Sequence, residues 1–108
     1  MTVEQVASVL QATECYFADA GREVTGGFAG DLLSYCMSKA KTDGVWFTIM
    51  NNTNVAAVAS LCDVALVLLC DGIQPDAALI ERCRANGINL AVTPLAVYEA
   101  SVSLGKTL

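Results

Sequence analysis

The chain contains no histidine, so it lacks the side chain that most often acts as a general base and that commonly binds zinc. Charged residues are also scarce, at 16% of 108 residues, and only six of them are Lys or Arg. With a net charge of −5 and no basic run, the sequence offers no electrostatic footprint for a phosphate backbone or an anionic lipid surface. We therefore expect neither a nucleic-acid partner nor a membrane partner.

Long apolar runs are absent as well. The longest covers the seven residues Val64 to Cys70, far below the roughly 20 residues of a membrane-spanning helix. The first residues, Met1 to Gln5, are polar and acidic, whereas a secretory signal begins with a basic region followed by an apolar one. These absences lead us to expect a cytoplasmic protein.

The five cysteines are odd in number, and no two have C-x-x-C spacing. They lie among apolar neighbours, which favours small buried hydrophobic residues in a reducing compartment over a disulfide framework. The alternative, a metal site, would need thiolates and carboxylates from distant parts of the chain. We expect neither a metal nor another cofactor. The cysteines are Cys15, Cys36, Cys62, Cys70 and Cys83.

Apolar residues are abundant, at 55% of the chain, and 108 residues suffice for one hydrophobic core. We therefore expect a single α/β domain over residues 1–108. The apolar share exceeds what a domain of this size normally hides, so a second copy is expected to cover part of the surface. Such a homodimer should bury at least about 1,000 Å² in total.

The first half of the chain predicts two helices and one short strand. Residues Thr2 to Gln5 match a capping box and open a first helix. Glu14 to Ala18 favours a strand, and a glycine-rich, irregular stretch follows it up to Gly30. A second helix should begin at a capping Asp31 and end near Gly44, with an inward stripe formed by Leu33, Cys36, Met37 and Ala40.

The second half predicts a regular alternation of strands and helices. We expect strands at residues 45–50, 64–70 and 88–92, and the unbroken apolar run of the middle one indicates a strand buried on both faces. Pro75 and Asn86-Gly87 mark the two ends of one intervening helix, and Thr93-Pro94 should open the last helix. The alternation predicts an α/β fold of three layers around a mostly parallel sheet with βαβ crossovers.

Four segments resemble the DRTGG domain family: residues 30–34, 46–49, 54–59 and 88–93. The resemblance extends over nearly the whole chain. It implies a fold like that of the N-terminal domain of HPr kinase. It also implies a regulatory character, since DRTGG domains are small modules found alone, with CBS domains in some inorganic pyrophosphatases, or fused to phosphotransacetylase-like enzymes.

Some members of that family are labelled HPr serine kinases, but this chain lacks the necessary motif. A P-loop reads G-x-x-x-x-G-K-[ST], and no such string occurs. Gly105-Lys106-Thr107 has the last part of the motif without the glycine loop before it. No Ser or Cys stands beside an activating base in a recognisable motif either. We therefore expect a protein that is not an enzyme.

The candidate ligand site follows from the parallel sheet, because loops that leave the carboxyl ends of parallel strands share one edge. The loops begin at residues 51, 71 and 93, and each leads toward a helix N-terminus, where free amides favour anions. The alternative is that these polar residues only cap helices. The predicted site consists of Asn51, Asn52, Asn54 and Thr93 around one concavity, with Gly30 and Asp31 as neighbours.

The leading hypothesis is a regulatory or ligand-sensing module that binds a small anionic metabolite or a nucleotide and acts on a partner protein. Two alternatives stay open. One is a purely structural protein–protein interaction module, and the other is a small enzyme of unknown reaction.

Overall fold

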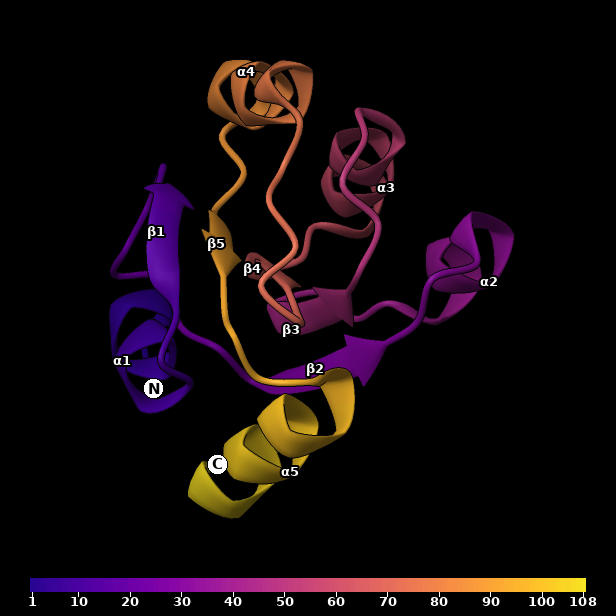
Figure 1. Cartoon of the computed structure of the whole chain (residues 1–108). Helices are drawn as coiled ribbons and strands as arrows, with labels where there is room; N and C mark the ends of the chain where they lie inside the picture. Colours follow the sequence, from indigo (N-terminus) through magenta and orange to yellow (C-terminus); the bar gives the residue numbers. More distant parts are fainter.

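The fold is a single five-stranded sheet with helices on both faces, as the computed structural model of residues 1–108 shows (Figure 1). The strand order is β1-β5-β4-β3-β2, and all neighbours are parallel except β1, which is antiparallel to β5. The expected three-layer α/β fold around a mostly parallel sheet is thus confirmed. The strands are β1 (Thr13–Tyr16), β2 (Gly26–Ala29), β3 (Gly44–Thr48), β4 (Leu66–Leu69) and β5 (Leu90–Val92).

Five helices cover the two faces: α1 (Val3–Val9), α2 (Leu33–Lys39), α3 (Asn54–Cys62), α4 (Ala77–Asn86) and α5 (Val97–Thr107). Helices α2, α3 and α4 lie on one face, and α1 and α5 lie on the other (Figure 1). Strands β2 to β5 follow one another across the sheet in chain order. Because every crossover steps in the same direction and has the same hand, all three crossover helices fall on one face.

The central strands explain the unbroken apolar runs of the sequence. Val67 and Leu69 of β4 belong to the core under α2, α3 and α4, whereas Leu66 and Leu68 belong to the core under α1 and α5. All four are buried, as expected for a strand covered on both faces. In β3, Trp46 faces the first core, and its neighbours on either side face the second.

Two predicted helix ends, the start of α1 and the end of α4, are confirmed. The capping box of α1 is formed, since Gln5 N donates to Thr2 Oγ1 and Thr2 N donates to Gln5 Oε1. Gly87 ends α4 in the left-handed conformation with a φ of 68°. No helix of the fold has the length and apolar composition required to cross a membrane.

Two helix starts were predicted wrongly. Helix α5 begins at Val97 with Ala96 as N-cap, so Thr93 and Pro94 do not open it. Thr93 is fully buried instead, and its hydroxyl donates to the carbonyl of Leu10 at 2.6 Å, because the end of α1 packs against this turn.

Helix α2 differs from its prediction at both ends. It begins at Leu33 with Leu32 as N-cap and no side-chain cap, so Asp31 does not cap it, and it ends at Lys39 rather than near residue 44. Met37 was expected to face inward but is 50% exposed. The physical reason is that α2 packs on α3 at the rim of the sheet, so only a narrow stripe around Cys36 is buried.

Candidate functional site

The loops after the four parallel strands all emerge at one edge of the sheet, which we call the carboxyl edge. They comprise residues 30–32, 49–53, 70–76 and 93–96. Strand β4 lies between β3 and β5. The loops that carry Asn51 and Thr93 are therefore two strand spacings apart, about 10 Å, with the loop after β4 between them.

Hydrogen bonds join neighbouring loops of the carboxyl edge. The side-chain amide of Asn51 donates to the carbonyl of Gln74 at 2.9 Å, and its own carbonyl accepts from Asp76 N at 3.1 Å. The next link runs from Gly72 N to the carbonyl of Thr93 at 2.9 Å. Asn51 and Thr93 thus hold the loop after β4 from its two sides.

Asp31 and Gly30 fasten the loop after β2 to strand β3. The carboxylate of Asp31 accepts from the Thr48 hydroxyl at 2.7 Å and from Ile49 N at 3.0 Å. The carbonyl of Gly30 accepts from the Trp46 indole at 3.0 Å. A Cβ on Gly30 would approach the Phe28 ring to 3.0 Å, so a larger residue at this position would require the ring to shift by a few tenths of an ångström.

Asn52 and Asn54 lie at the start of α3. The Asn52 side chain accepts from Asn54 N at 3.0 Å, and Thr53, the N-cap, makes no side-chain capping bond. Capping of α3 therefore explains the side chain of Asn52 but not those of Thr53 and Asn54. Both Asn52 and Asn54 are exposed, whereas Thr93 is buried and Asn51 is half-buried.

A cavity of about 340 Å³ opens at the carboxyl edge where β1 meets β5. It includes parts of the expected loops after β4 and β5, but none of the six predicted site residues lines it. The sequence predicted a strand over Glu14 to Ala18, which overlaps β1, but it did not predict the antiparallel pairing of that strand with β5. The lining residues are Thr13, Glu14, Cys15, Gly72, Gln74, Val92 and Pro94.

The electrostatics of the carboxyl edge are acidic. The four loops and the adjoining end of β1 carry no Lys or Arg, and their acidic residues are Glu14, Asp31, Asp71 and Asp76. Burial, and secondarily Glu14, raises the pKa of the Cys15 thiol. Burial and then Asp71 raise the pKa of Cys70 to about 11. Both thiols are therefore protonated at neutral pH and are poor nucleophiles.

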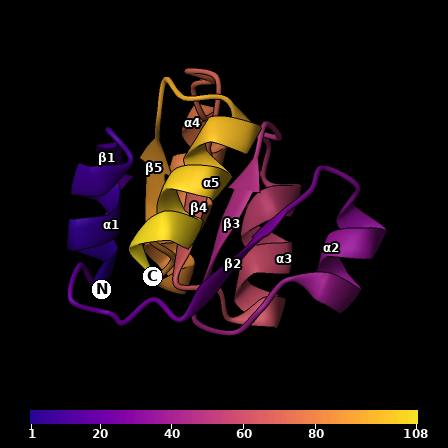
Figure 2. The same ribbon diagram turned by 90° about the horizontal axis from the view of Figure 1, so that it is seen from below.

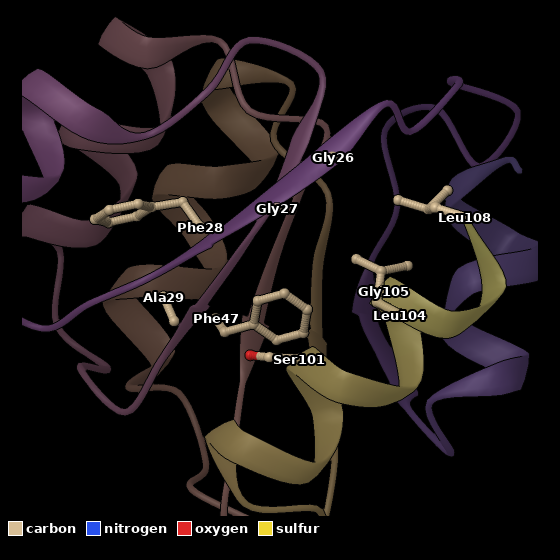
Figure 3. A pocket seen from close by; sticks show the side chains of 9 residues that line it. All are labelled: Gly26, Gly27, Phe28, Ala29, Phe47, Ser101, Leu104, Gly105 and Leu108. Carbon is tan, nitrogen blue, oxygen red and sulfur yellow. The ribbon is translucent and has the colours of Figure 1, made fainter.

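A second cavity, of about 330 Å³, lies between strand β2 and helix α5 (Figure 3). The Phe47 ring lies between the two elements, with Gly27 on the strand side and Ser101 and Gly105 on the helix side. The Ser101 hydroxyl is buried without a hydrogen-bond partner. No charged side chain lines this cavity, in contrast to the one at the carboxyl edge.

Comparison with known proteins places the fold. No family model and no curated protein matches the sequence. Among solved structures, the chain superposes with a TM-score of 0.78 and 15% identity on the CBS and DRTGG domains of the regulatory region of Clostridium perfringens pyrophosphatase, complexed with its activator diadenosine tetraphosphate. The match covers 99% of this chain but 47% of that one, so this chain spans about half the neighbour's length. The DRTGG-like fold implied by the sequence resemblance is confirmed.

Proposed function

We propose that this chain is a regulatory, ligand-sensing module rather than an enzyme, and that it acts on a partner protein as a homodimer. The observation that carries the proposal is the structural match over 99% of the chain to a regulatory region that binds a nucleotide activator. The raised thiol pKa of Cys15 at the larger cavity supports binding over nucleophilic chemistry.

The ligand site that we propose is the 340 Å³ cavity of the carboxyl edge together with the loops that frame it. A cavity of this volume lies at the lower end of the range for small-molecule sites. Exposed Asn52 and Asn54, and the rim near Gly30 and Asp31, would contact a ligand that extends beyond the cavity. Asn51 would not contact the ligand but would position the loop that carries Gln74, because its side chain is hydrogen-bonded to that loop.

The ligand class is limited by charge. Acidic side chains around the cavity repel bare phosphates, whereas the dipole of α3 favours negative charge near its N-terminus, where the amides of Asn54, Val55 and Ala56 already have partners within the chain. A nucleotide whose phosphates are neutralised by Mg²⁺ satisfies both conditions. A small anion without a counter-cation satisfies only the second, so we favour the nucleotide among the ligands considered.

A sensing route starts from the loop after β4. This loop is hydrogen-bonded to the carbonyl of Thr93, and the buried Thr93 hydroxyl is bonded to Leu10 at the end of α1. A ligand that moves Gly72 therefore acts on Thr93 and, through it, on α1 on the far face of the sheet. The signal would reach a partner through this helix layer.

The test is a thermal-shift titration with diadenosine tetraphosphate, with and without Mg²⁺, beside adenosine and inorganic phosphate. At a hundredfold excess over Kd, binding adds about 2.7 kcal/mol to the free energy of unfolding, which raises Tm by about 10 °C or more. We expect the largest shift for diadenosine tetraphosphate with Mg²⁺. If none of these compounds raises Tm, ligand sensing of this chemistry is refuted.

A pair of variants locates the site. Thr13→Leu adds bulk to a lining position of the cavity, and Ser60→Leu adds the same side chain at an exposed position of α3. We expect Thr13→Leu to weaken binding at least tenfold and Ser60→Leu to leave it unchanged. Equal affinity in both variants would place the ligand elsewhere.

The alternative, an interaction module that binds no ligand, is favoured by one observation. The exposed side of α2 carries large apolar residues, namely Leu32, Tyr35 and Met37. Such a module would co-purify with a partner protein and show no thermal shift with any ligand of the panel.

A further inference from the structure

Strand β2 is an outer strand of the sheet, and it has no device that blocks further pairing. It has one neighbour, β3, so half of its main-chain groups face no strand. Residues 24–30 read Val-Thr-Gly-Gly-Phe-Ala-Gly and contain no charge and no proline. Natural proteins normally protect such edges with charges, prolines, bulges or a covering segment.

The other outer strand, β1, has two of these protections. It carries the exposed Glu14, and its register with β5 shifts between Glu14 and Tyr16, as at a β-bulge. The charged tip of Arg84 also stacks on the Tyr16 ring at 4.8 Å. An edge left open on one side of the sheet and protected on the other indicates that β2 pairs with something.

On the face of the sheet covered by α5, the residues around β2 are small enough for another polypeptide chain to approach closely. The 330 Å³ cavity there is walled by small residues, among them Gly27, Ala29, Ser101 and Gly105 (Figure 3). Gly105 lies inside α5, and a Cβ added to it would meet nothing within 4 Å. Since glycine in a helix costs about 1 kcal/mol relative to alanine, packing within this chain does not explain Gly105.

On the opposite face of the sheet, α2 lies beside β2, and its outer side is apolar and exposed. Figures 1 and 2 both place α2 outermost on this side of the molecule, and Tyr35 lies 5.8 Å from the Phe28 ring of β2. Of the eight large hydrophobic residues that are exposed, three lie on or next to α2, and Leu108 lines the cavity on the opposite face. Exposed apolar residues thus flank β2 on both faces of the sheet.

The distribution of charge indicates which partner could pair with β2. A two-fold axis brings each residue of an interface near the same residue of its partner, so self-association of a chain with a net charge of −5 requires a patch where like charges do not meet. Segment 24–30 itself carries no charge, although Glu23 and Asp31 flank it, whereas the carboxyl edge carries several acids. The occupant that this neutral, small-residue edge fits is a second copy of this chain.

We propose that two copies of the chain pair antiparallel along β2 and join their sheets into one continuous sheet. The inference rests on the homodimer of the proposed function and assigns it a surface. Backbone pairing through the edge and contacts of the flanking apolar residues should together bury more than about 1,000 Å². The cavity between β2 and α5 then lies at the subunit boundary.

The test places a lysine on the edge. Ala29 is exposed, and a Cβ on Gly26 would meet nothing within 4 Å, so Ala29→Lys and Gly26→Lys both fit the folded chain. The control is Ala78→Lys, which makes the same change of charge at an exposed position of α4. Sedimentation velocity over a concentration series should give a dimer for the native chain and for Ala78→Lys. Both edge variants should dimerise at least tenfold more weakly, with unchanged far-UV circular dichroism.

Hydrogen exchange supplies a second measurement. The amides of residues 26–29 should exchange more slowly in the dimer than in the Ala29→Lys monomer, while those of β1 should not change. A native chain that is monomeric at all concentrations overturns the inference. A dimer that survives both edge lysines overturns the assigned surface but not the homodimer. Ligand binding at the carboxyl edge is measured separately, so a monomer that still binds the ligand contradicts this inference alone.

Discussion

Acidic residues are paired with a cation at the amino edge of the parallel strands but not at the carboxyl edge. At the amino edge, Arg22 lies between two acids, with its Nη2 2.8 Å from Asp43 and 3.1 Å from Asp63, and it also donates to the Asp63 carbonyl. At the carboxyl edge, no cation accompanies the acids, and Asp31 binds only a hydroxyl and an amide. The amino edge is closed by paired charges, whereas the carboxyl edge leaves charge available to a ligand.

The largest effect should come from Asn89 at the amino edge, a buried residue that the sequence did not single out. Its side chain accepts from Asp19 N and donates to the carbonyls of Asp19 and Ala65, each at 2.9 Å. Asn89→Ala should lower the free energy of unfolding by about 3 kcal/mol, because it leaves these groups without partners. Urea unfolding measures the loss, and Asn86→Ala, at an exposed site with one bond, is the control. Equal losses would contradict the structural role of the amino edge.

Raising the pH from 8 to 10 should have the next largest effect. Burial raises the pKa of Cys70 and of Cys83 from 9.0 to about 11, so the folded chain keeps thiol protons that the unfolded chain loses above pH 9. This contribution is fully present below pH 9, and the free energy of unfolding should fall by about 1 kcal/mol per pH unit per thiol between pH 9 and 11. Urea unfolding at pH 8, 9 and 10 tests the slope. The double variant Cys70→Ala, Cys83→Ala should show a shallower one, and an identical slope would refute the cause.

At the carboxyl edge, Thr93→Val should cost about 2 kcal/mol. The substitution keeps the shape of the side chain but removes the donor to the buried turn at Leu10. If Thr93 also transmits the ligand signal, the variant should bind ligand with reduced affinity after correction for stability. Unchanged affinity would separate this residue from the sensing route.

The smallest effect should come from Arg22→Met at the amino edge. The side chains of Asp43 and Asp63 are 45% and 67% exposed, so solvent screens the pairs and the loss should be about 1 kcal/mol. High salt should shrink the difference between variant and native chain, since it screens exposed ion pairs. A difference that is independent of salt would indicate that packing of the Arg22 stem is responsible instead.

Most of the fold could be predicted because its signals are local. The apolar run around Leu66 predicts a strand covered on both faces, and Gly87 predicts the end of α4. The start of α5 could not be predicted in this way. Thr93-Pro94 has the pattern of a helix start, but a tertiary bond to Leu10 holds Thr93 in a turn before the helix.

The candidate site was predictable only as an edge of the sheet. The parallel arrangement brings the loops after β2 to β5 together, as the alternation of elements implies. The cavity itself depends on Glu14 and its neighbours in β1, which come from the antiparallel strand. Pairing of that strand with β5 joins residues about 80 positions apart, and no local pattern specifies such a contact.

The consecutive order of strands β2 to β5 has a mechanical consequence. Because the crossover helices all occupy one face, the opposite face is covered only by α1 and α5, the first and last helices of the chain, which contact each other. Both chain ends therefore belong to one layer and lie close together (Figure 1). Adjacent ends allow a domain to be inserted into another chain with little disturbance. A host that drew the two ends apart would pull directly on this layer and uncover the core around Phe47.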